Sequence, residues 1–229
     1  MTGFSFKQFT VNHDRCAMKV GTDGVLLGAW ANGGKRILDV GTGSGLIALF
    51  MAQRFPDAHI TAIDIDHDAY MQATINAEVS VFSKRITVVE SSFQDFSDNM
   101  FDAIVCNPPF FNNSLKCKDK QRNIARHTDT LPFHDLFKSV SRSLDENGEF
   151  SVIIPAACRT DFDMEGLFAG LFIKRICAIK TLPHKPVSRY LIAYTKKISP
   201  QIEITEEYIN DESMRRSKWY ASLTENFYL

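Results

Sequence analysis

The tetrapeptide Asn107-Pro108-Pro109-Phe110 is the part of the sequence best equipped to do chemistry. It directly follows an apolar run, 101–106, that predicts a buried strand, and its two prolines prevent a strand or helix from continuing. The amide oxygen of Asn107 and the carbonyl oxygen of Pro108 can both accept hydrogen bonds from an NH2 group, and Phe110 can stack on a flat ring. A proline-rich loop without function is the alternative. With a cofactor site beside it, the tetrapeptide favours a flat, amino-bearing substrate such as an extruded base.

A glycine-rich turn earlier in the chain could supply that cofactor site. Gly41, Gly43 and Gly45 follow an expected strand over 36–40 and precede an apolar helix that extends to about Arg54. Such a turn lets a ligand approach the backbone, and the start of the helix adds partial positive charge. The spacing is GxGxG rather than GxGxxG, so the glycines alone are weak evidence.

The next strand, expected over 59–63, ends in the carboxylate of Asp64. It lies about 20 residues beyond the glycines, where acidic side chains bind the hydroxyls of a ribose. An aspartate at a strand end can instead cap the following helix, and we assign that role to Asp66. The spacing therefore favours sugar binding by Asp64.

The strands that carry these groups alternate with helices, which predicts an α/β fold with a mostly parallel, doubly wound, Rossmann-like sheet. Helices are expected over 22–30, where Thr22 or Asp23 is the cap, and over 67–80, 133–145 and 160–169. The last two strands are expected to form an antiparallel hairpin at the edge of the sheet. We count seven strands, over 36–40, 59–63, 85–90, 101–106, 149–154, 171–181 and 189–196.

The composition is that of an ordinary soluble globular protein. Of the 229 residues, 45% are hydrophobic and 23% are charged, and the formal net charge of −1 gives no overall basicity. The N-terminus lacks the features of a signal peptide, and no apolar run is long enough to span a bilayer. The five cysteines form no CxxC pair and the six histidines no HExxH motif. We expect a cytoplasmic protein of one domain, with no metal, disulfide or membrane anchor.

A basic segment, 112–130, follows the tetrapeptide. Its basic residues outnumber its acidic ones, Asp119 and Asp129. A solvated loop and a lid over a substrate are equally compatible with this composition. Its attachment to the tetrapeptide favours the lid. The candidate contacts to RNA phosphates are Lys116, Lys118, Lys120, Arg122 and Arg126.

Taken together, these motifs resemble those of class I S-adenosylmethionine-dependent methyltransferases that modify amino nitrogens. The shared motifs are 39–45, Asp64 and 107–110. Within that class, the chain is most similar to the tRNA1(Val) (adenine-37-N6)-methyltransferase family. That similarity covers essentially the full length and includes the stretches 6–11, 19–30, 125–127 and 227–229.

The family resemblance implies S-adenosylmethionine as the cofactor, with S-adenosylhomocysteine as its product. It implies that Asp64 holds the ribose and that Ile65 and Phe93 flank the adenine. Ser92 stands where many relatives have an acid, so we expect the contacts to adenine to shift to Asp95 or to the backbone. The methionyl part is assigned to Asp39, Gly41, Gly43 and Gly45, with help from Thr22, and catalysis to Asn107, Pro108, Pro109 and Phe110.

The resemblance also implies a domain plan and a substrate. A capping extension, 1–34, precedes a methyltransferase core, 35–198, and a tail, 199–229, packs on that core. The expected reaction is direct methylation of N6 of a flipped adenine, A37 in the anticodon loop of tRNA1(Val), without an obligate protein partner.

Other functions remain open at this point. The same tetrapeptide could serve methylation of guanine N2 in ribosomal RNA, adenine N6 in DNA or glutamine N5 in protein. An NAD-dependent oxidoreductase would share the glycines and Asp64, although Leu46 replaces its third glycine. A catalytically inactive RNA-binding module is the third class.

Overall fold

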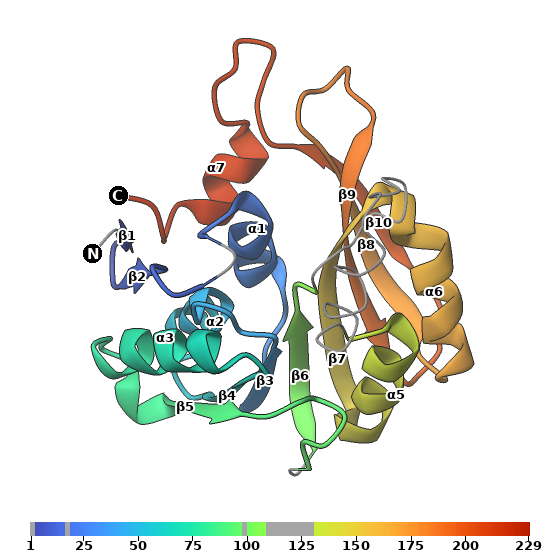
Figure 1. The fold of residues 1–229 in the computed structure, drawn as a ribbon. Coiled ribbons are helices and arrows are strands. Elements are labelled where there is room, and N and C mark those ends of the chain that lie inside the picture. Colours follow the sequence, from blue (N-terminus) through green and yellow to red (C-terminus); the bar gives the residue numbers. More distant parts are fainter. Residues whose placement is uncertain (1–2, 17–18, 98–99, 109–130) are drawn as a thin grey trace, which may run out of the picture.

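An eight-stranded sheet forms the centre of the computed structural model, which describes residues 3–16, 19–97, 100–108 and 131–229 (Figure 1). The strands are β3 (Arg36–Val40), β4 (His59–Asp64), β5 (Ile86–Glu90), β6 (Phe101–Cys106), β7 (Leu144–Pro155), β8 (Phe172–Lys180), β9 (Val187–Thr195) and β10 (Glu203–Tyr208). Their order is β10-β8-β9-β7-β6-β3-β4-β5. Strands β5, β4, β3, β6 and β7 are parallel to one another, whereas β9 is antiparallel to both β7 and β8. The predicted doubly wound sheet is confirmed.

The eighth strand, β10, is the main departure from the expected topology. It pairs in parallel with β8, so the hairpin of β8 and β9 lies inside the sheet rather than at its edge. Nearly all of its residues are exposed, including Ile204, and it forms the edge of the sheet. The sequence alternates at Ile202 and Ile204, but the strand has no buried face, so this short pattern does not distinguish it from a tail.

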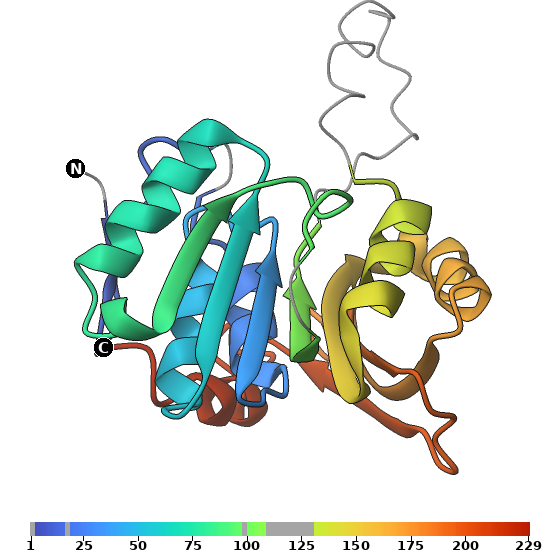
Figure 2. The ribbon, with the colours of Figure 1, turned by 90° about the horizontal axis from the view of Figure 1, so that it is seen from below.

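Helices cover the two faces of the sheet separately (Figures 1 and 2). On one side are α1 (Thr22–Trp30), α2 (Leu46–Arg54), α3 (His67–Glu78) and α7 (Lys218–Thr224), and on the other are α5 (Phe133–Ser143) and α6 (Arg159–Phe168). Short 3-10 turns occur at Ser83–Arg85 and Ala156–Cys158. Each face has its own apolar core, with Phe50 buried in one and Phe137 in the other. Among the described residues, no helix has the length and apolar character needed to cross a membrane.

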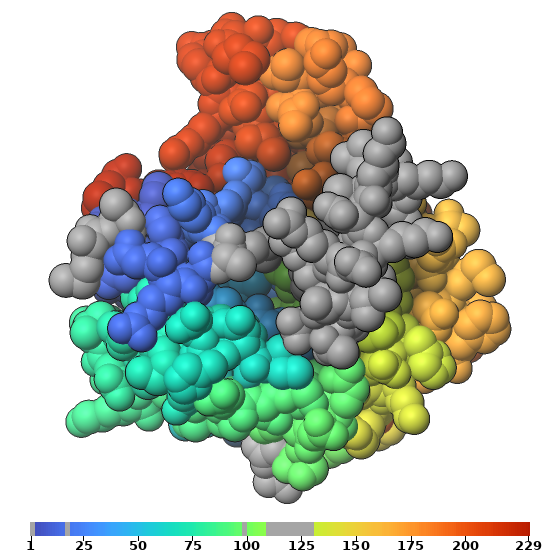
Figure 3. Space-filling view, viewed as in Figure 1, coloured from blue at the N-terminus to red at the C-terminus, as the bar shows by residue number. Residues whose placement is uncertain are grey.

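The two ends of the chain meet on the outer side of α2 (Figures 1 and 3). A small antiparallel sheet of β1 (Gly3–Ser5) and β2 (Thr10–Asn12) lies near the C-terminus. The ring of Phe50 stacks on Phe227 at 4.1 Å between centroids, and Lys7 N donates to the Phe227 carbonyl at 2.8 Å. Both ends therefore pack on the helix that follows the glycine turn.

Candidate active site

Three of the sequence motifs lie side by side at the carboxyl ends of β6, β3 and β4 (Figure 1). Val40 at the end of β3 is in register with Ile63 of β4 and with Cys106 of β6. The residues that follow these three are Gly41, Asp64 and Asn107. Neighbouring strands are about 4.8 Å apart, so two strand spacings of roughly 10 Å separate the outer two residues. This edge can therefore accept one ligand of nucleoside size.

The glycine turn between β3 and α2 requires left-handed backbone at three positions. The φ angles are +66° at Gly41, +57° at Gly43 and +79° at Gly45. A Cβ atom at Gly41 or Gly43 would meet nothing within 4 Å, whereas at Gly45 it would lie 3.4 Å from Ala73. Gly45 is thus packed against α3, and Gly41 and Gly43 border open space. A ligand can approach the backbone there.

Asp39, the last residue but one of β3, is a carboxylate buried beneath that turn. One oxygen accepts from Thr42 Oγ1 at 2.6 Å and from Ala48 N at 3.0 Å. The other oxygen has no hydrogen-bond partner among the described residues. Burial raises the pKa of Asp39 to about 7, although the two hydrogen bonds act to lower it. An unpartnered buried carboxylate oxygen is suited to a cationic ligand group.

Asp64 connects the end of β4 to the glycine turn. Its Oδ2 accepts from Gly43 N at 2.8 Å and its Oδ1 from Asp66 N at 3.0 Å. Burial raises the pKa of Asp64, while these backbone hydrogen bonds act to lower it. Each carboxylate oxygen has a further lone pair that a hydroxyl could use. The capping role assigned to Asp66 is confirmed, because its side chain accepts from Ala69 N at the start of α3.

Asn107 is half-buried, and its side chain has no hydrogen-bond partner in the part of the chain that the structure describes. Pro108 is buried directly after it. Pro109 and Phe110 lie outside the described residues. So do the five basic residues proposed for RNA, Lys116, Lys118, Lys120, Arg122 and Arg126.

The start of α1 lies close to the same edge. A Cβ atom at Gly24 would come within 2.9 Å of Leu46, the first residue of α2, so the two helices begin in close contact. The N-cap of α1 is Gly21 and makes no side-chain hydrogen bond, so the prediction that Thr22 or Asp23 is the cap is wrong. The Asp23 carboxylate is instead paired with Arg189 Nε at 2.9 Å. Thr22 is exposed at the first turn of α1.

Ile65 and Phe93, the residues expected beside an adenine, differ in exposure. Ile65 is 53% exposed and follows Asp64 directly. The Phe93 side chain is buried in the core on the α5 side of the sheet, so only its backbone can face the edge. Ser92, which stands where many relatives have an acid, donates from Oγ to Oδ2 of Asp95, the carboxylate expected to replace that acid, at 2.7 Å.

Asn76 is a buried residue near the site that the sequence reasoning missed. Its amide nitrogen donates to the carbonyls of Asn12 at 2.7 Å and Ser44 at 2.8 Å, and its oxygen accepts from Asn12 N at 3.0 Å. It therefore joins the N-terminal segment to the glycine turn. The available signal was a polar residue beside Ala73 and Ala77 on the inward face of α3.

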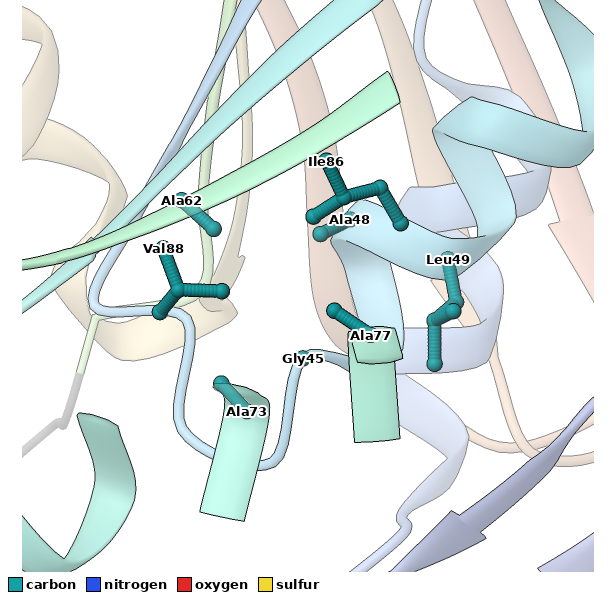
Figure 4. Close-up of a pocket in the computed structure, with 8 residues that line it drawn as sticks. All are labelled: Gly45, Ala48, Leu49, Ala62, Ala73, Ala77, Ile86 and Val88. Atoms are coloured by element: carbon teal, nitrogen blue, oxygen red, sulfur yellow. The ribbon is translucent and has the colours of Figure 1, made fainter. Parts of the chain in front are cut away.

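A small gap beneath the glycine turn is lined by side chains of α2, α3, β4 and β5 (Figure 4). Ala48, Ala73 and Ala77 keep these elements close, and the gap is too narrow to admit a water molecule. It belongs to the packing that supports Gly45 and is not a ligand site.

Comparison of the sequence with known proteins shows the family of this chain. The model of the methyltransferase small domain matches residues 19–174. A tRNA1(Val) (adenine(37)-N6)-methyltransferase of Phocaeicola vulgatus is 48% identical, over 99% of this chain and 97% of the relative. The enzyme of the same name from Pseudoalteromonas translucida is 43% identical, over 100% of this chain and 99% of the relative. The chain belongs to the tRNA1(Val) (adenine(37)-N6)-methyltransferase family. This confirms the resemblance inferred from the motifs.

Solved structures show how widely the fold of this family member occurs. A predicted O-methyltransferase of Agrobacterium tumefaciens superposes with a TM-score of 0.69 at 20% identity, covering 90% of this chain and 96% of that one. A TehB-like SAM-dependent methyltransferase of Corynebacterium glutamicum gives 0.54 at 18% identity, covering 79% and 90%. The fold is that of Rossmann-like methyltransferases.

Proposed function

We propose that this protein transfers the methyl group of S-adenosylmethionine to N6 of adenine 37 in tRNA1(Val). Its relatives of that name match almost the entire chain. The observation that carries the chemistry is the strand register that sets Asn107 beside Gly41, with Asp64 on the next strand beyond it. A cofactor site and an acceptor for an amino group thereby share one edge.

The residues at this edge fit the cofactor. The unpartnered oxygen of Asp39 is available to a cationic part of the methionyl group, and the open space at Gly41 and Gly43 lets that group reach the backbone. Asp64 would hold the ribose hydroxyls, with exposed Ile65 beside the adenine. When bound, the cofactor supplies an electrophilic methyl group on a sulfonium.

Asn107 and Pro108 would activate the substrate amino group. The lone pair of an adenine N6 is delocalised into the ring, which makes this nitrogen a poor nucleophile. Accepting its two N–H groups at the Asn107 amide oxygen and the Pro108 carbonyl would localise the lone pair. The same acceptors would stabilise the positive charge that develops on nitrogen during in-line transfer. The proton of the product can leave to solvent, so no strong general base is needed.

The tRNA assignment is supported by charge as well as by family. A base in a single-stranded anticodon loop is easier to extrude than one in a duplex. The β8–β9 turn and the segment between β10 and α7 stand at the same edge of the sheet as Asn107 and form a projection (Figures 1 and 3). It carries the exposed cations Lys185 and Arg215. Together with the basic residues of 112–130, these could contact phosphates.

Nucleoside mass spectrometry tests this proposal. Purified protein, S-adenosylmethionine and a tRNA1(Val) transcript are incubated, and the digested nucleosides are analysed. We expect N6-methyladenosine from this transcript and none from a matched transcript in which guanosine replaces adenosine 37. A methylated guanosine, N6-methyladenosine from the control transcript or no transfer at all would contradict the proposal.

A further inference from the structure

Arg142, on α5, makes three hydrogen bonds to the short segment that follows β5. Its Nη2 donates to the carbonyls of Phe93 and Phe96, both at 3.0 Å, and its Nη1 to that of Gln94 at 3.1 Å. Carbonyl groups in an irregular segment need such partners because no neighbouring strand or helix supplies them. Arg142 thus fixes the backbone of this segment.

The segment in question, 91–97, leaves β5 at the edge that carries the candidate site and runs toward α5 (Figure 2). Ser91 N donates to the Asp64 carbonyl at 2.9 Å, which places the start of the segment against the end of β4. A nucleoside whose sugar is held by Asp64 has the glycine turn on one side and this segment on the other. Its base would therefore meet 91–97.

The polar groups of the segment depend on its backbone conformation. Ser92 Oγ donates to Asp95 Oδ2 at 2.7 Å and accepts from Asp95 N at 3.1 Å, while Phe96 N donates to the Ser92 carbonyl at 3.0 Å. The buried rings of Phe93 and Phe96 hold one side of this turn in the core. Arg142 binds the backbone carbonyls of Phe93, Gln94 and Phe96. Only a planar guanidinium can donate to all three at once.

We propose that Arg142 is a positioning residue for the cofactor, because it fixes the segment 91–97 that reads the adenine ring. The inference rests on the proposed function, since it requires a cofactor with adenine beside Asp64. Arg142 acts through Ser92 and Asp95 and does not touch the ligand itself.

Arg85 offers a matched control. It also donates three hydrogen bonds to backbone carbonyls, those of Phe55 at 3.1 Å, Ala58 at 3.1 Å and Ala52 at 2.7 Å. These carbonyls lie at the end of α2 and directly before β4, and Arg85 itself directly precedes β5, so the contacts are at the opposite edge of the sheet from the candidate site. Replacing either arginine by methionine removes three hydrogen bonds to backbone carbonyls. Only the Arg142 substitution removes them from the segment proposed to contact the adenine.

The experiment measures the affinity of Arg142→Met, Arg142→Lys and Arg85→Met for two ligands by calorimetry, with thermal unfolding in parallel. The ligands are S-adenosylhomocysteine and S-inosylhomocysteine, which lacks the amino group of adenine. We expect Arg142→Met to bind S-adenosylhomocysteine roughly tenfold more weakly, the equivalent of about one hydrogen bond, and to lose preference for adenine. Arg142→Lys should recover part of the loss, and Arg85→Met should lose thermal stability but keep wild-type affinity and preference.

Wild-type affinity and preference in both Arg142 variants would overturn this inference alone. An equal loss of affinity in Arg85→Met would also overturn it, because the effect would then be one of general stability. If the wild-type protein failed to bind S-adenosylhomocysteine, the proposed function itself would fall.

Discussion

Replacing Asp39 by asparagine measures how much ionisation of this buried carboxylate lowers the free energy of unfolding. Burial raises the pKa of this group from 3.8 to about 7. At 1.36 kcal/mol for each pKa unit, that rise corresponds to about 4 kcal/mol. The native protein keeps the proton up to about pH 7, whereas the unfolded chain releases it near pH 4. The stability due to this proton is therefore complete below about pH 4 and is lost as the pH rises through 7.

Urea unfolding of wild type and Asp39→Asn from pH 4 to pH 8 gives the test. The amide does not ionise, yet its oxygen can still accept from Thr42 and Ala48. We expect the free energy of unfolding of the variant, relative to wild type, to increase by up to about 4 kcal/mol over this range. Parallel pH profiles for the two proteins would show that burial does not raise the pKa of Asp39.

The same substitution should lower the affinity for the cofactor while it raises the stability of the fold above pH 7. A cationic ligand group binds the ionised carboxylate, so wild-type affinity for S-adenosylhomocysteine should rise as the pH increases through about 7. Asp39→Asn should bind more weakly and without that dependence. Equal affinity and an equal pH profile would show that the unpartnered oxygen does not face the ligand.

Three further predictions concern the turn, the core and the RNA. Gly43→Ala and Gly170→Ala both place alanine at positive φ (+57° and +76°) with open space for Cβ, so each should lose about 1–2 kcal/mol in urea unfolding. Only Gly43→Ala should weaken S-adenosylhomocysteine binding, and an equal effect of both would exclude a ligand at the turn. Burial acts to raise the pKa of Glu149, but Arg175, paired at 2.8 Å, and its other partners outweigh it and lower the pKa. Glu149→Gln should therefore lower the free energy of unfolding by about 3 kcal/mol near pH 7. In urea unfolding, this difference from wild type should shrink as the pH falls below about 4.5, and a constant difference would contradict the pairing. Finally, neutralising three lysines should reduce the slope of log tRNA affinity against log salt by about 2, at about 0.7 for each phosphate contact, and an unchanged slope would remove them from the RNA interface. These lysines are Lys116, Lys118 and Lys120.

The centre of the fold could be predicted from the sequence because its strands are continuous apolar runs. The expected strands 36–40 and 101–106 match β3 and β6, and both are buried between two layers of helices. The edge strand β10 was missed because its sequence, EITEEY, has no buried face. The cap of α1 was misassigned because Asp23 pairs with Arg189, far away in the sequence.

The candidate site divides in a similar way. Spacing along the chain indicated the glycine turn, Asp64 and the residue after β6, because each follows a recognisable strand. The residues that hold these groups in place could not be predicted. Asn76 and Arg142 act through hydrogen bonds to backbone atoms more than 30 positions away, and a single sequence contains no information on such pairs.

In the proposed mechanism, the Asn107 amide activates the amino group of the substrate beside the bound cofactor. Its most direct test is the single-turnover rate of methyl transfer to tRNA by Asn107→Ala, measured together with the dissociation constant of S-adenosylhomocysteine. We expect a rate at least about a hundredfold below wild type with cofactor affinity unchanged. A wild-type rate, or equal losses of rate and affinity, would contradict it.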